Sequence, residues 1–386
     1  MPTVFVPKER TPGETRVAAT PETVKHMKKA GLRVLVEAGA GAEAYCLDGA
    51  YVEAGAELAT DLAAAYGEAD LVLKVRGPCP SDAGHGDEVT MLRPGAVLVG
   101  LLSPLQRPEV VRRLAAHGAS ALAMELVPRI TRAQKMDALS SQASIAGYKA
   151  VLVAAWRLPK YFPLLMTAAG TVKPARIVVM GAGVAGLQAI ATARRLGAIV
   201  EASDVRPAVK EQVESLGGKF IEPPVTAESG EGQGGYAREV SAEYLREQQK
   251  IVREHVLVAD CVITTALVPG KKAPVLVTAE TVEKMRPGSV IVDLAVEQGG
   301  NCELSVCGED VVRHGVTIVG HPNLAATMPG DASMLYARNV WALVSEQVKD
   351  GKVVLQREDE VVKGCLVTHE GAVVHEATRK LCEAAP

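Results

Sequence analysis

A glycine-rich turn at the end of an apolar run constrains the fold of this chain more than any other segment. Residues 176–180 are mostly apolar and lead directly into the turn 181–186. In a GxGxxG turn the first glycine allows a tight bend after a strand, the second lets backbone approach a phosphate, and the third lets the next helix pack against the sheet. The pattern predicts a strand, a turn and a helix over 184–196 whose N-terminus binds the pyrophosphate of a nicotinamide dinucleotide. The residues expected to contact the cofactor here are Gly181, Ala182, Gly183, Val184 and Gly186.

An acidic residue near the end of the next predicted strand bears on which dinucleotide binds. Asp204 follows the apolar run 198–202 and lies about 20 residues beyond the glycines, where a carboxylate holds ribose hydroxyls and repels a 2′-phosphate. It is favoured over Glu201, which lies within the strand, and it indicates NAD(H) rather than NADP(H). Two alternatives stay open, because Arg206 can accept a 2′-phosphate and Asp204 can be a simple turn residue. The expected contacts are Asp204, Val205 and Arg206.

Composition excludes several other classes of protein. A chain of 386 residues that is 48% hydrophobic can bury two domain-sized cores, at about 150 residues per domain. A net charge of −3 without a long basic run argues against nucleic-acid binding. No apolar run approaches the length of about 18 residues that a membrane helix needs, and the N-terminus lacks a signal-peptide pattern, so we expect a cytoplasmic protein without membrane insertion. The seven cysteines form no CxxC pair, and no metal site is expected.

Apolar segments alternate with amphipathic ones along the whole chain, which predicts an α/β protein with parallel sheets covered by helices on both faces. Helices over 144–158 and 331–349 are expected to lead into the second domain and back to the first. We therefore expect two Rossmann-like domains, with a dinucleotide-binding domain at 139–326 inserted into a first domain made of 1–138 and 327–386. The predicted strands are 4–6, 33–37, 71–75, 96–101, 120–124, 176–180, 198–202, 219–221, 261–265, 289–293 and 316–319.

Three N-terminal segments, Lys8-Glu9, 14–21 and 72–75, combine with the glycine turn to resemble the alanine dehydrogenase and nicotinamide nucleotide transhydrogenase superfamily. In alanine dehydrogenases the matching arginine and lysine hold the carboxylate and carbonyl of a keto acid, which places Arg16 and Lys74 in that role. Lys74 is notable without the resemblance, because a cation inside an apolar strand needs a partner or a polar cavity. The alternative is an edge-strand lysine whose ammonium group reaches water.

The segment 97–104 departs from the alanine dehydrogenases, because the alignment places their catalytic histidine at Ser103. Reduction of a keto acid needs a proton as well as a hydride, and the general acid is missing. Transfer between two nicotinamides needs only the hydride. Glu297 stands where alanine dehydrogenases have an aspartate, and we assign it no role.

Segments 128–142, 204–217 and 264–270 closely resemble the NAD(H)-binding component of the proton-translocating transhydrogenase family. Without the resemblance, 128–142 would be interpreted as a solvated loop. The resemblance implies that Arg129, Gln134, Asp137 and Ser140 surround the nicotinamide ring and its amide, with Gln134 nearest the second nucleotide. It also implies a mobile loop at 234–237 that closes over NAD(H), within a glycine-rich stretch expected to be mobile. The further cofactor contacts implied are Gly235, Tyr236, Thr265, Ala266 and Leu267.

The resemblance implies a Re/Si-specific, proton-translocating transhydrogenase component that passes hydride directly from NADH to NADP⁺ on another subunit. Such a chain is active only with its partners, an NADP(H)-binding subunit (domain III) and a membrane proton-channel subunit (domain II). It is expected to be a homodimer, peripheral to the cytoplasmic membrane through those partners. Two alternatives stay open: an alanine dehydrogenase-like NAD-dependent amino-acid dehydrogenase, and a non-catalytic NAD(H)-sensing subunit.

Overall fold

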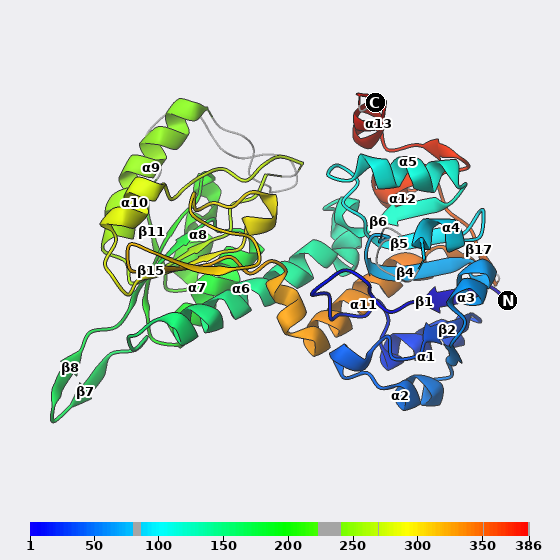
Figure 1. The fold of residues 1–386 in the computed structure, drawn as a ribbon, viewed down its shortest axis with the longest axis horizontal. Helices are drawn as coiled ribbons and strands as arrows, with labels where there is room; N and C mark the ends of the chain where they lie inside the picture. The colour runs from blue at the N-terminus through cyan, green and yellow to red at the C-terminus, as the bar shows by residue number, and fades with distance from the viewer. Residues whose placement is uncertain (80–85, 223–240, 269, 350, 385–386) are drawn as a thin grey trace. The chain divides into compact units, whose positions relative to one another are not determined.

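The computed structural model describes residues 1–79, 86–222, 241–268, 270–349 and 351–384. The chain divides into two compact units (Figure 1). Unit 1 consists of Met1–Gln142 and Ala326–Pro386, and unit 2 is the continuous segment Ala143–Ala325. The predicted mobile loop, with Gly235 and Tyr236, lies outside the described residues.

Unit 1 is built on an eight-stranded sheet with the strand order β19-β18-β6-β5-β4-β1-β2-β3. All neighbours from β6 to β3 are parallel, whereas β18 is antiparallel to β6 and β19 is antiparallel to β18. The central strands are mostly apolar, as expected for a sheet covered on both faces, and Lys74 of β4 is the buried exception. The strands are β1 (Thr3–Val6), β2 (Arg33–Glu37), β3 (Glu57–Ala59), β4 (Leu71–Arg76), β5 (Val97–Leu101), β6 (Ser120–Ala123), β18 (Leu366–His369) and β19 (Ala372–Val373).

Successive residues of these strands point into two different cores, because side chains alternate across a sheet. Val4 and Leu73 pack with helices α1, α2, α11 and α12 on one face. Phe5 and Val72 pack with α3, α4 and α5 on the other, and α13 lies next to α5. The helices are α1 (Pro21–Lys29), α2 (Asp48–Glu53), α3 (Leu62–Glu68), α4 (Glu88–Met91), α5 (Pro108–Ala116), α11 (Pro329–Ser345), α12 (Glu360–Cys365) and α13 (Glu376–Ala384).

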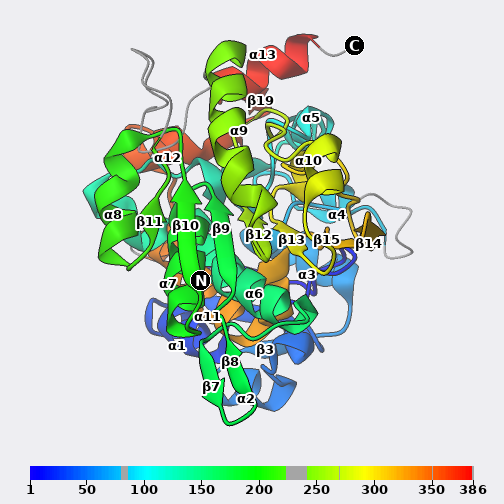
Figure 2. The ribbon, with the colours of Figure 1, turned by 90° about the vertical axis from the view of Figure 1, so that its left-hand side faces the viewer.

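Unit 2 contains a seven-stranded sheet with the order β11-β10-β9-β12-β13-β15-β14, seen from its own side in Figure 2. Helices α6, α7 and α8 cover one face, and α9 and α10 cover the other. The strands are β9 (Arg176–Met180), β10 (Ile199–Ser203), β11 (Lys219–Phe220), β12 (Cys261–Thr264), β13 (Val290–Asp293), β14 (Asp310–Arg313) and β15 (Val316–Val319). The helices are α6 (Ala138–Arg157), whose residues up to Gln142 belong to unit 1, α7 (Val184–Arg195), α8 (Lys210–Ser215), α9 (Ala242–Leu257) and α10 (Ala279–Lys284).

The α/β architecture and every predicted strand are confirmed; the strands that were not predicted are β3, which pairs parallel with β2, and the strands of several hairpins. β14 and β15 are joined by His314-Gly315, and β18 and β19 by Glu370-Gly371, each pair with positive φ at both residues. Such two-residue turns make antiparallel hairpins, which a simple alternation of strands and helices does not include. A further hairpin, β7 (Leu165–Thr167) and β8 (Gly170–Val172), extends away from the sheet of unit 2 (Figure 1).

Two predicted helices have different limits in the structure. The helix predicted over 144–158 is α6, which begins six positions earlier at Ala138, because Asp137 caps it. The helix predicted over 331–349 is α11, which begins at Pro329 and ends at Ser345. Its last predicted residues form the short hairpin of β16 (Val348–Lys349) and β17 (Lys352–Val353) instead. Among the described residues, no helix has the length and apolar character needed to cross a membrane.

Candidate functional site

The three glycines of the turn between β9 and α7 meet different surroundings. Gly181 has φ +101°, and a Cβ there would lie 2.5 Å from Thr265 Oγ1. A Cβ on Gly186 would lie 1.8 Å from the carbonyl oxygen of Gly181, so this position needs glycine for packing alone. Gly183 has φ −75°, and a Cβ there would meet nothing within 4 Å. The protein itself does not require glycine at 183, so the open space at the α7 N-terminus fits a phosphate approached by backbone.

Asp204 links this turn to the end of β10. Its carboxylate Oδ2 accepts a hydrogen bond from Ala182 N at 2.7 Å, and the residue is 6% exposed. Oδ1 accepts from Arg206 N at 2.8 Å, which closes an Asx turn, and the guanidinium pairs with both carboxylate oxygens. Asp204 thus shapes a turn and also contacts the glycine loop. Glu201 lies within β10, with Oε2 3.0 Å from His255 Nδ1.

The loop after β12 is held against the glycine turn. Thr265 Oγ1 donates to the carbonyl oxygen of Gly181 at 3.0 Å. The next residue, Ala266, has its N–H and its carbonyl oxygen both bonded to the side chain of Asn301, which is fully buried. Leu267, at the exposed end of the loop, is 39% accessible. These contacts bring the glycine turn, Asp204 and the 265–267 loop together at the C-terminal edge of the sheet, where dinucleotides bind in such folds.

Two residues that support this loop were missed by the sequence analysis, Asn301 and Asp293. Asp293 ends β13, is 1% exposed, and accepts from Thr264 Oγ1 at 3.0 Å and from Ser305 Oγ at 2.7 Å. It also accepts from the N–H groups of Ala295 and Cys302, so one buried carboxylate organises the chain from 293 to 305. The sequence signal that could have pointed to Asn301 was its position directly after Gly299-Gly300, two glycines that both have positive φ in the structure.

Four residues predicted to surround the nicotinamide belong to unit 1. Asp137 accepts from Ser140 N at 2.9 Å and from Ser140 Oγ at 2.6 Å, which caps the first turn of α6. Arg129 Nε lies 3.9 Å from Asp137 Oδ2, so the structure brings these three residues together. Gln134 lies in the 3₁₀ helix η4 (Thr131–Met136) and is exposed.

The interpretation of residues 128–142 as a solvated loop is wrong. Ala133 and Met136 are buried in the core of unit 1. Asn339 of α11 donates to the carbonyl oxygen of Lys135 at 2.8 Å and accepts from Ser141 Oγ at 2.7 Å. The segment is therefore a packed turn of helix that presents Gln134 outward.

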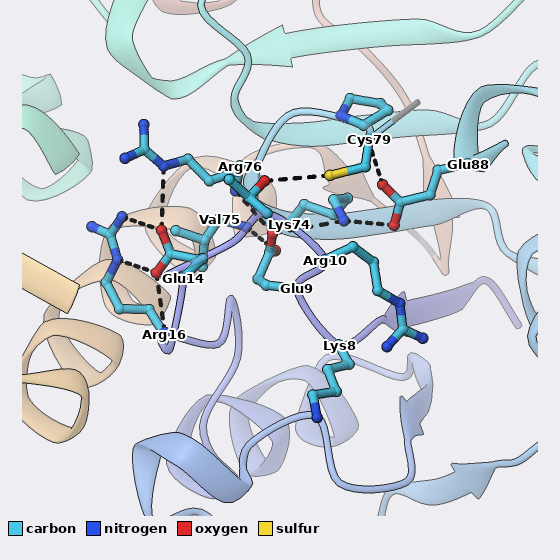
Figure 3. A network of polar contacts seen from close by, with 12 residues as sticks. Lys8, Glu9, Arg10, Glu14, Arg16, Lys74, Val75, Arg76, Cys79 and Glu88 are labelled. Atoms are coloured by element: carbon cyan, nitrogen blue, oxygen red, sulfur yellow. Dashed lines mark hydrogen bonds and ion pairs between the residues drawn. The ribbon is translucent and has the colours of Figure 1, made fainter. Parts of the chain in front are cut away.

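Lys74 lies at the centre of a buried polar network (Figure 3). It is 1% exposed on β4, an interior strand between β1 and β5, so the edge-strand alternative is wrong. Its Nζ lies 2.7 Å from Glu88 Oε1 and 3.7 Å from Glu9 Oε2. Burial alone would lower the pKa of Lys74, but the two carboxylates outweigh burial and raise it. The lysine is therefore charged and already paired.

Arg16 is likewise paired within unit 1. Its Nε and Nη2 donate to the two carboxylate oxygens of Glu14 at 2.7 and 2.6 Å, and Nη1 donates to Gln142 Oε1 at 2.8 Å. Arg76 Nε lies 3.2 Å from the same carboxylate (Figure 3). Burial opposes ionisation of Glu14, but Arg16 outweighs it and lowers the pKa of Glu14. The ion pair between Arg16 and Glu14 is bidentate, and Arg16 is 3% exposed.

Ser103 stands where the resemblance places a histidine in alanine dehydrogenases. It has φ +51°, in the left-handed region, and its N–H donates to Glu125 Oε1. Leu102 N donates to the other oxygen at 3.2 Å, and burial raises the pKa of Glu125. Glu297 is exposed in the 3₁₀ helix η7 (Val296–Gln298). Among the described residues, no group of three histidine, cysteine or acidic side chains could hold a metal ion.

Comparison with known proteins identifies the family. Residues 5–146 match the family model described as alanine dehydrogenase/PNT, N-terminal domain, and residues 150–376 match alanine dehydrogenase/PNT, C-terminal domain. The chain belongs to the alanine dehydrogenase/PNT family. The match to the C-terminal model covers most of unit 2 and continues into the C-terminal part of unit 1.

Within the alanine dehydrogenase/PNT family, the chain is more similar to the transhydrogenases. It is 52% identical over 377 residues to the first part of NAD(P) transhydrogenase subunit alpha of Rhodospirillum rubrum, covering 97% of this chain and 98% of the relative. The solved transhydrogenase of Sinorhizobium meliloti superposes with a TM-score of 0.86 at 49% identity, over 96% and 100% of the two chains. A solved L-alanine dehydrogenase gives 0.82 at 28% identity, over 99% of each.

Proposed function

We propose that this chain is the NAD(H)-binding component of a proton-translocating, Re/Si-specific transhydrogenase. In the proposed reaction, NADH bound to this chain is oxidised to NAD⁺, and NADP⁺ bound to another subunit is reduced to NADPH. The hydride passes directly between the two rings, and the reaction balances without a proton. The name of the Rhodospirillum rubrum relative and its 52% identity over nearly the full length of both chains support this assignment.

The residues of unit 2 fit NAD(H). The open space at Gly183 and the free N–H groups expected at a helix N-terminus suit a pyrophosphate, and the buried Asp204 carboxylate suits the hydroxyls of an unphosphorylated ribose. Thr265, Ala266 and Leu267 would form the opposite wall, in which Thr265 is bonded to Gly181 and Ala266 to Asn301. When bound, the nicotinamide supplies the hydride. The protein binds and orients it.

Orientation of the ring is the proposed task of Arg129, Asp137, Ser140 and Gln134. Asp137 holds the Ser140 hydroxyl and restrains Arg129, which leaves both able to bind the carboxamide. Gln134, exposed on η4, would lie nearest the second nucleotide. Gly235 and Tyr236 would close over NAD(H) and exclude water. Positioning of two reactants is sufficient for large rate enhancements in reactions of this type.

The observation that most supports hydride transfer over keto-acid reduction is that Arg16 and Lys74 are already paired inside the protein. Both cations are buried, Arg16 donates to Glu14 and Gln142, and Lys74 donates to Glu88. A keto-acid carboxylate would have to displace these internal partners at the cost of leaving buried charges unpaired. Ser103 also offers no imidazole to supply the proton that keto-acid reduction consumes.

The proposed partners are an NADP(H)-binding subunit, which is domain III of the enzyme, and a membrane proton-channel subunit, which is domain II. The chain would act as a homodimer on the cytoplasmic side of the membrane and remain peripheral to it. The Rhodospirillum rubrum relative is named as one portion of a subunit, which supports the existence of partner chains.

The test mixes the purified chain with NADH, the NADP(H)-binding component and an NADP⁺ analogue whose reduced form absorbs at a separate wavelength. We expect reduction of the analogue with both proteins present and none with either protein alone. A parallel reaction with NADH, pyruvate and ammonium should show no turnover. Rapid NADH oxidation there would establish the amino-acid dehydrogenase instead, and NADH binding without transfer in the first reaction would favour the sensing subunit.

A further inference from the structure

Asp293 is a buried carboxylate whose hydrogen-bond partners are all neutral. The residue is 1% exposed, and Oδ1 accepts from Thr264 Oγ1 and from Ala295 N, each at 3.0 Å. Oδ2 accepts from Cys302 N at 3.0 Å and from Ser305 Oγ at 2.7 Å. These four donors fill the roughly four lone-pair sites of an ionised carboxylate, whereas a protonated carboxyl group would have to donate from one of its oxygens.

The negative charge of Asp293 is not balanced by a neighbouring cation. Among the residues that the structure describes, no lysine, arginine or histidine forms an ion pair with it. Burial of such a charge is costly even when neutral donors surround it. An uncharged side chain could accept hydrogen bonds in this turn at a lower cost, so the buried charge points to an electrostatic role. Inside a protein such a charge acts over several ångströms, because the effective dielectric constant is well below that of water.

Asp293 lies in the half of the sheet that faces the nicotinamide end of a bound dinucleotide. A dinucleotide fold has two mononucleotide-binding halves that meet at the switch point of the sheet. Here β9, β10 and β11 form one half, which carries Asp204, and β12, β13 and β15 form the other (Figure 2). Asp293 ends β13 and is the register partner of Thr264, which ends β12. With the adenosine ribose at Asp204, the nicotinamide half belongs above the ends of β12 and β13.

We propose that the buried charge of Asp293 stabilises NAD⁺ relative to NADH in the nucleotide site of unit 2. The nicotinamide ring of NAD⁺ carries a positive charge that the reduced ring lacks, while the two forms have the same phosphates. A fixed negative charge beneath the ring therefore distinguishes the two forms and favours loss of the hydride. The inference rests on the proposed function, because it concerns the redox preference of the same site.

The variant Asp293→Asn tests the proposal by calorimetric titration of the full chain with NAD⁺ and with NADH. The ratio of the NAD⁺ dissociation constant to the NADH dissociation constant should rise by about tenfold over the natural chain, the size of one partly screened charge interaction. A purely structural role of Asp293 would weaken the binding of both nucleotides to the same extent. An unchanged ratio would therefore overturn the proposal.

Two control variants separate the charge from the hydrogen bonds. Ser305→Ala removes one donor to Asp293 but keeps its charge, and it should leave the ratio unchanged. Glu201→Gln neutralises a buried carboxylate in the other half of the sheet, which lies beside His255 and Lys219, and it should also leave the ratio unchanged. A change in Ser305→Ala as large as that in Asp293→Asn would overturn the proposal.

The measured ratio remains decisive if Asp293→Asn is destabilised. Both nucleotides bind only the folded chain, so the unfolded fraction cancels from the ratio of the two dissociation constants. Asp293→Ser, which keeps an acceptor without the charge, is the second variant if the first does not fold, and the same rise is expected. A natural chain that binds neither nucleotide would overturn the proposed function, whereas a natural chain that binds both, with an unchanged ratio in the variants, would overturn only this inference.

Discussion

The side chain of Asn301 is hydrogen-bonded to both backbone polar groups of Ala266, a residue 35 positions away. Oδ1 accepts from Ala266 N at 3.0 Å, and Nδ2 donates to the Ala266 carbonyl oxygen at 2.9 Å. Nδ2 also donates to Pro274 O at 2.8 Å, and the residue is fully buried. One asparagine therefore fixes the loop that we propose forms a wall of the dinucleotide site.

Replacement Asn301→Ala should weaken both folding and NADH binding. It leaves three partly buried backbone groups without this partner, so the free energy of unfolding should fall by about 1–3 kcal/mol and NADH affinity by about tenfold. Urea unfolding and calorimetry measure the two effects. Gln249→Ala is the matched control, because Gln249 donates to the neighbouring carbonyl of Val275 and does not contact Ala266. Unchanged NADH affinity in Asn301→Ala would refute a role for the loop in binding.

Gly183→Ala should separate binding from folding. The new methyl group meets no protein atom within 4 Å, so thermal unfolding should stay close to that of the natural chain. It would occupy the space proposed for the pyrophosphate, and NADH affinity should fall by about tenfold or more. Gly67→Ala, also in open space, serves as the control and should leave affinity unchanged. If Gly183→Ala binds NADH normally, the phosphates lie elsewhere.

The two roles of Asp137, helix cap and proposed orienter of the ring, respond to different substitutions. Asp137→Ala removes the cap of α6 and should destabilise the chain by about 0.5–2 kcal/mol. Asp137→Asn retains a capping oxygen but loses the charge facing Arg129. We expect it to unfold like the natural chain while single-turnover hydride transfer, measured with the partner component, slows by about tenfold or more. If Asp137→Asn transferred hydride as fast as the natural chain, Asp137 would act only as the cap of α6.

Lys74→Met should destabilise unit 1 strongly without affecting NADH binding. Removing the ammonium group leaves Glu88 and Glu9 buried without their cation, a change that costs about 3–5 kcal/mol in comparable sites. Denaturant unfolding checks the loss, and Lys363→Met, at an exposed lysine of the same unit, should have no measurable effect. If the Lys74→Met chain were as stable as the natural chain, the ion pairs of Lys74 would contribute nothing to the stability of unit 1.

His375 should make the C-terminal helix α13 sensitive to acid. Its Nδ1 lies 2.7 Å from Thr378 Oγ1, and burial lowers the pKa of His375 below 6.5 despite the opposing effect of Glu376. The folded state therefore favours the neutral ring. Its stabilising effect is complete above pH 6.5, the ordinary value, and is lost as the pH falls through the lower folded value.

Hydrogen exchange of the α13 amides measures this effect. Protection corrected for intrinsic exchange should decrease below pH 6.5 in the natural chain. In His375→Asn, which keeps a side-chain acceptor but does not titrate, protection should be independent of pH over the same interval. The same loss of protection in both chains would assign it to other groups.

The sequence predicted the strands better than it predicted the polar contacts. Each apolar run that was predicted to be a strand, such as 176–180 and 316–319, is a strand in the structure, because a buried parallel strand is apolar on both faces. The hairpins at His314-Gly315 and Glu370-Gly371 were missed although their turn residues carry a signal. The sequence analysis left open whether Lys74 meets a partner or reaches water, and it gave Asn301 no role.

Local chemistry explains what the sequence alone determined: the main apolar strands, the glycine turn after β9, the position of Asp204 at the end of β10, and membership of the family. Each depends on residues within a few positions of one another, whose backbone preferences and periodicity are readable along the chain. Only the tertiary structure decided that Lys74 meets Glu88, that Asn301 holds Ala266 and that Asp204 reaches Ala182. These partners are distant in sequence, and a buried polar group takes whichever partner the packed sheets and helices bring within hydrogen-bonding distance.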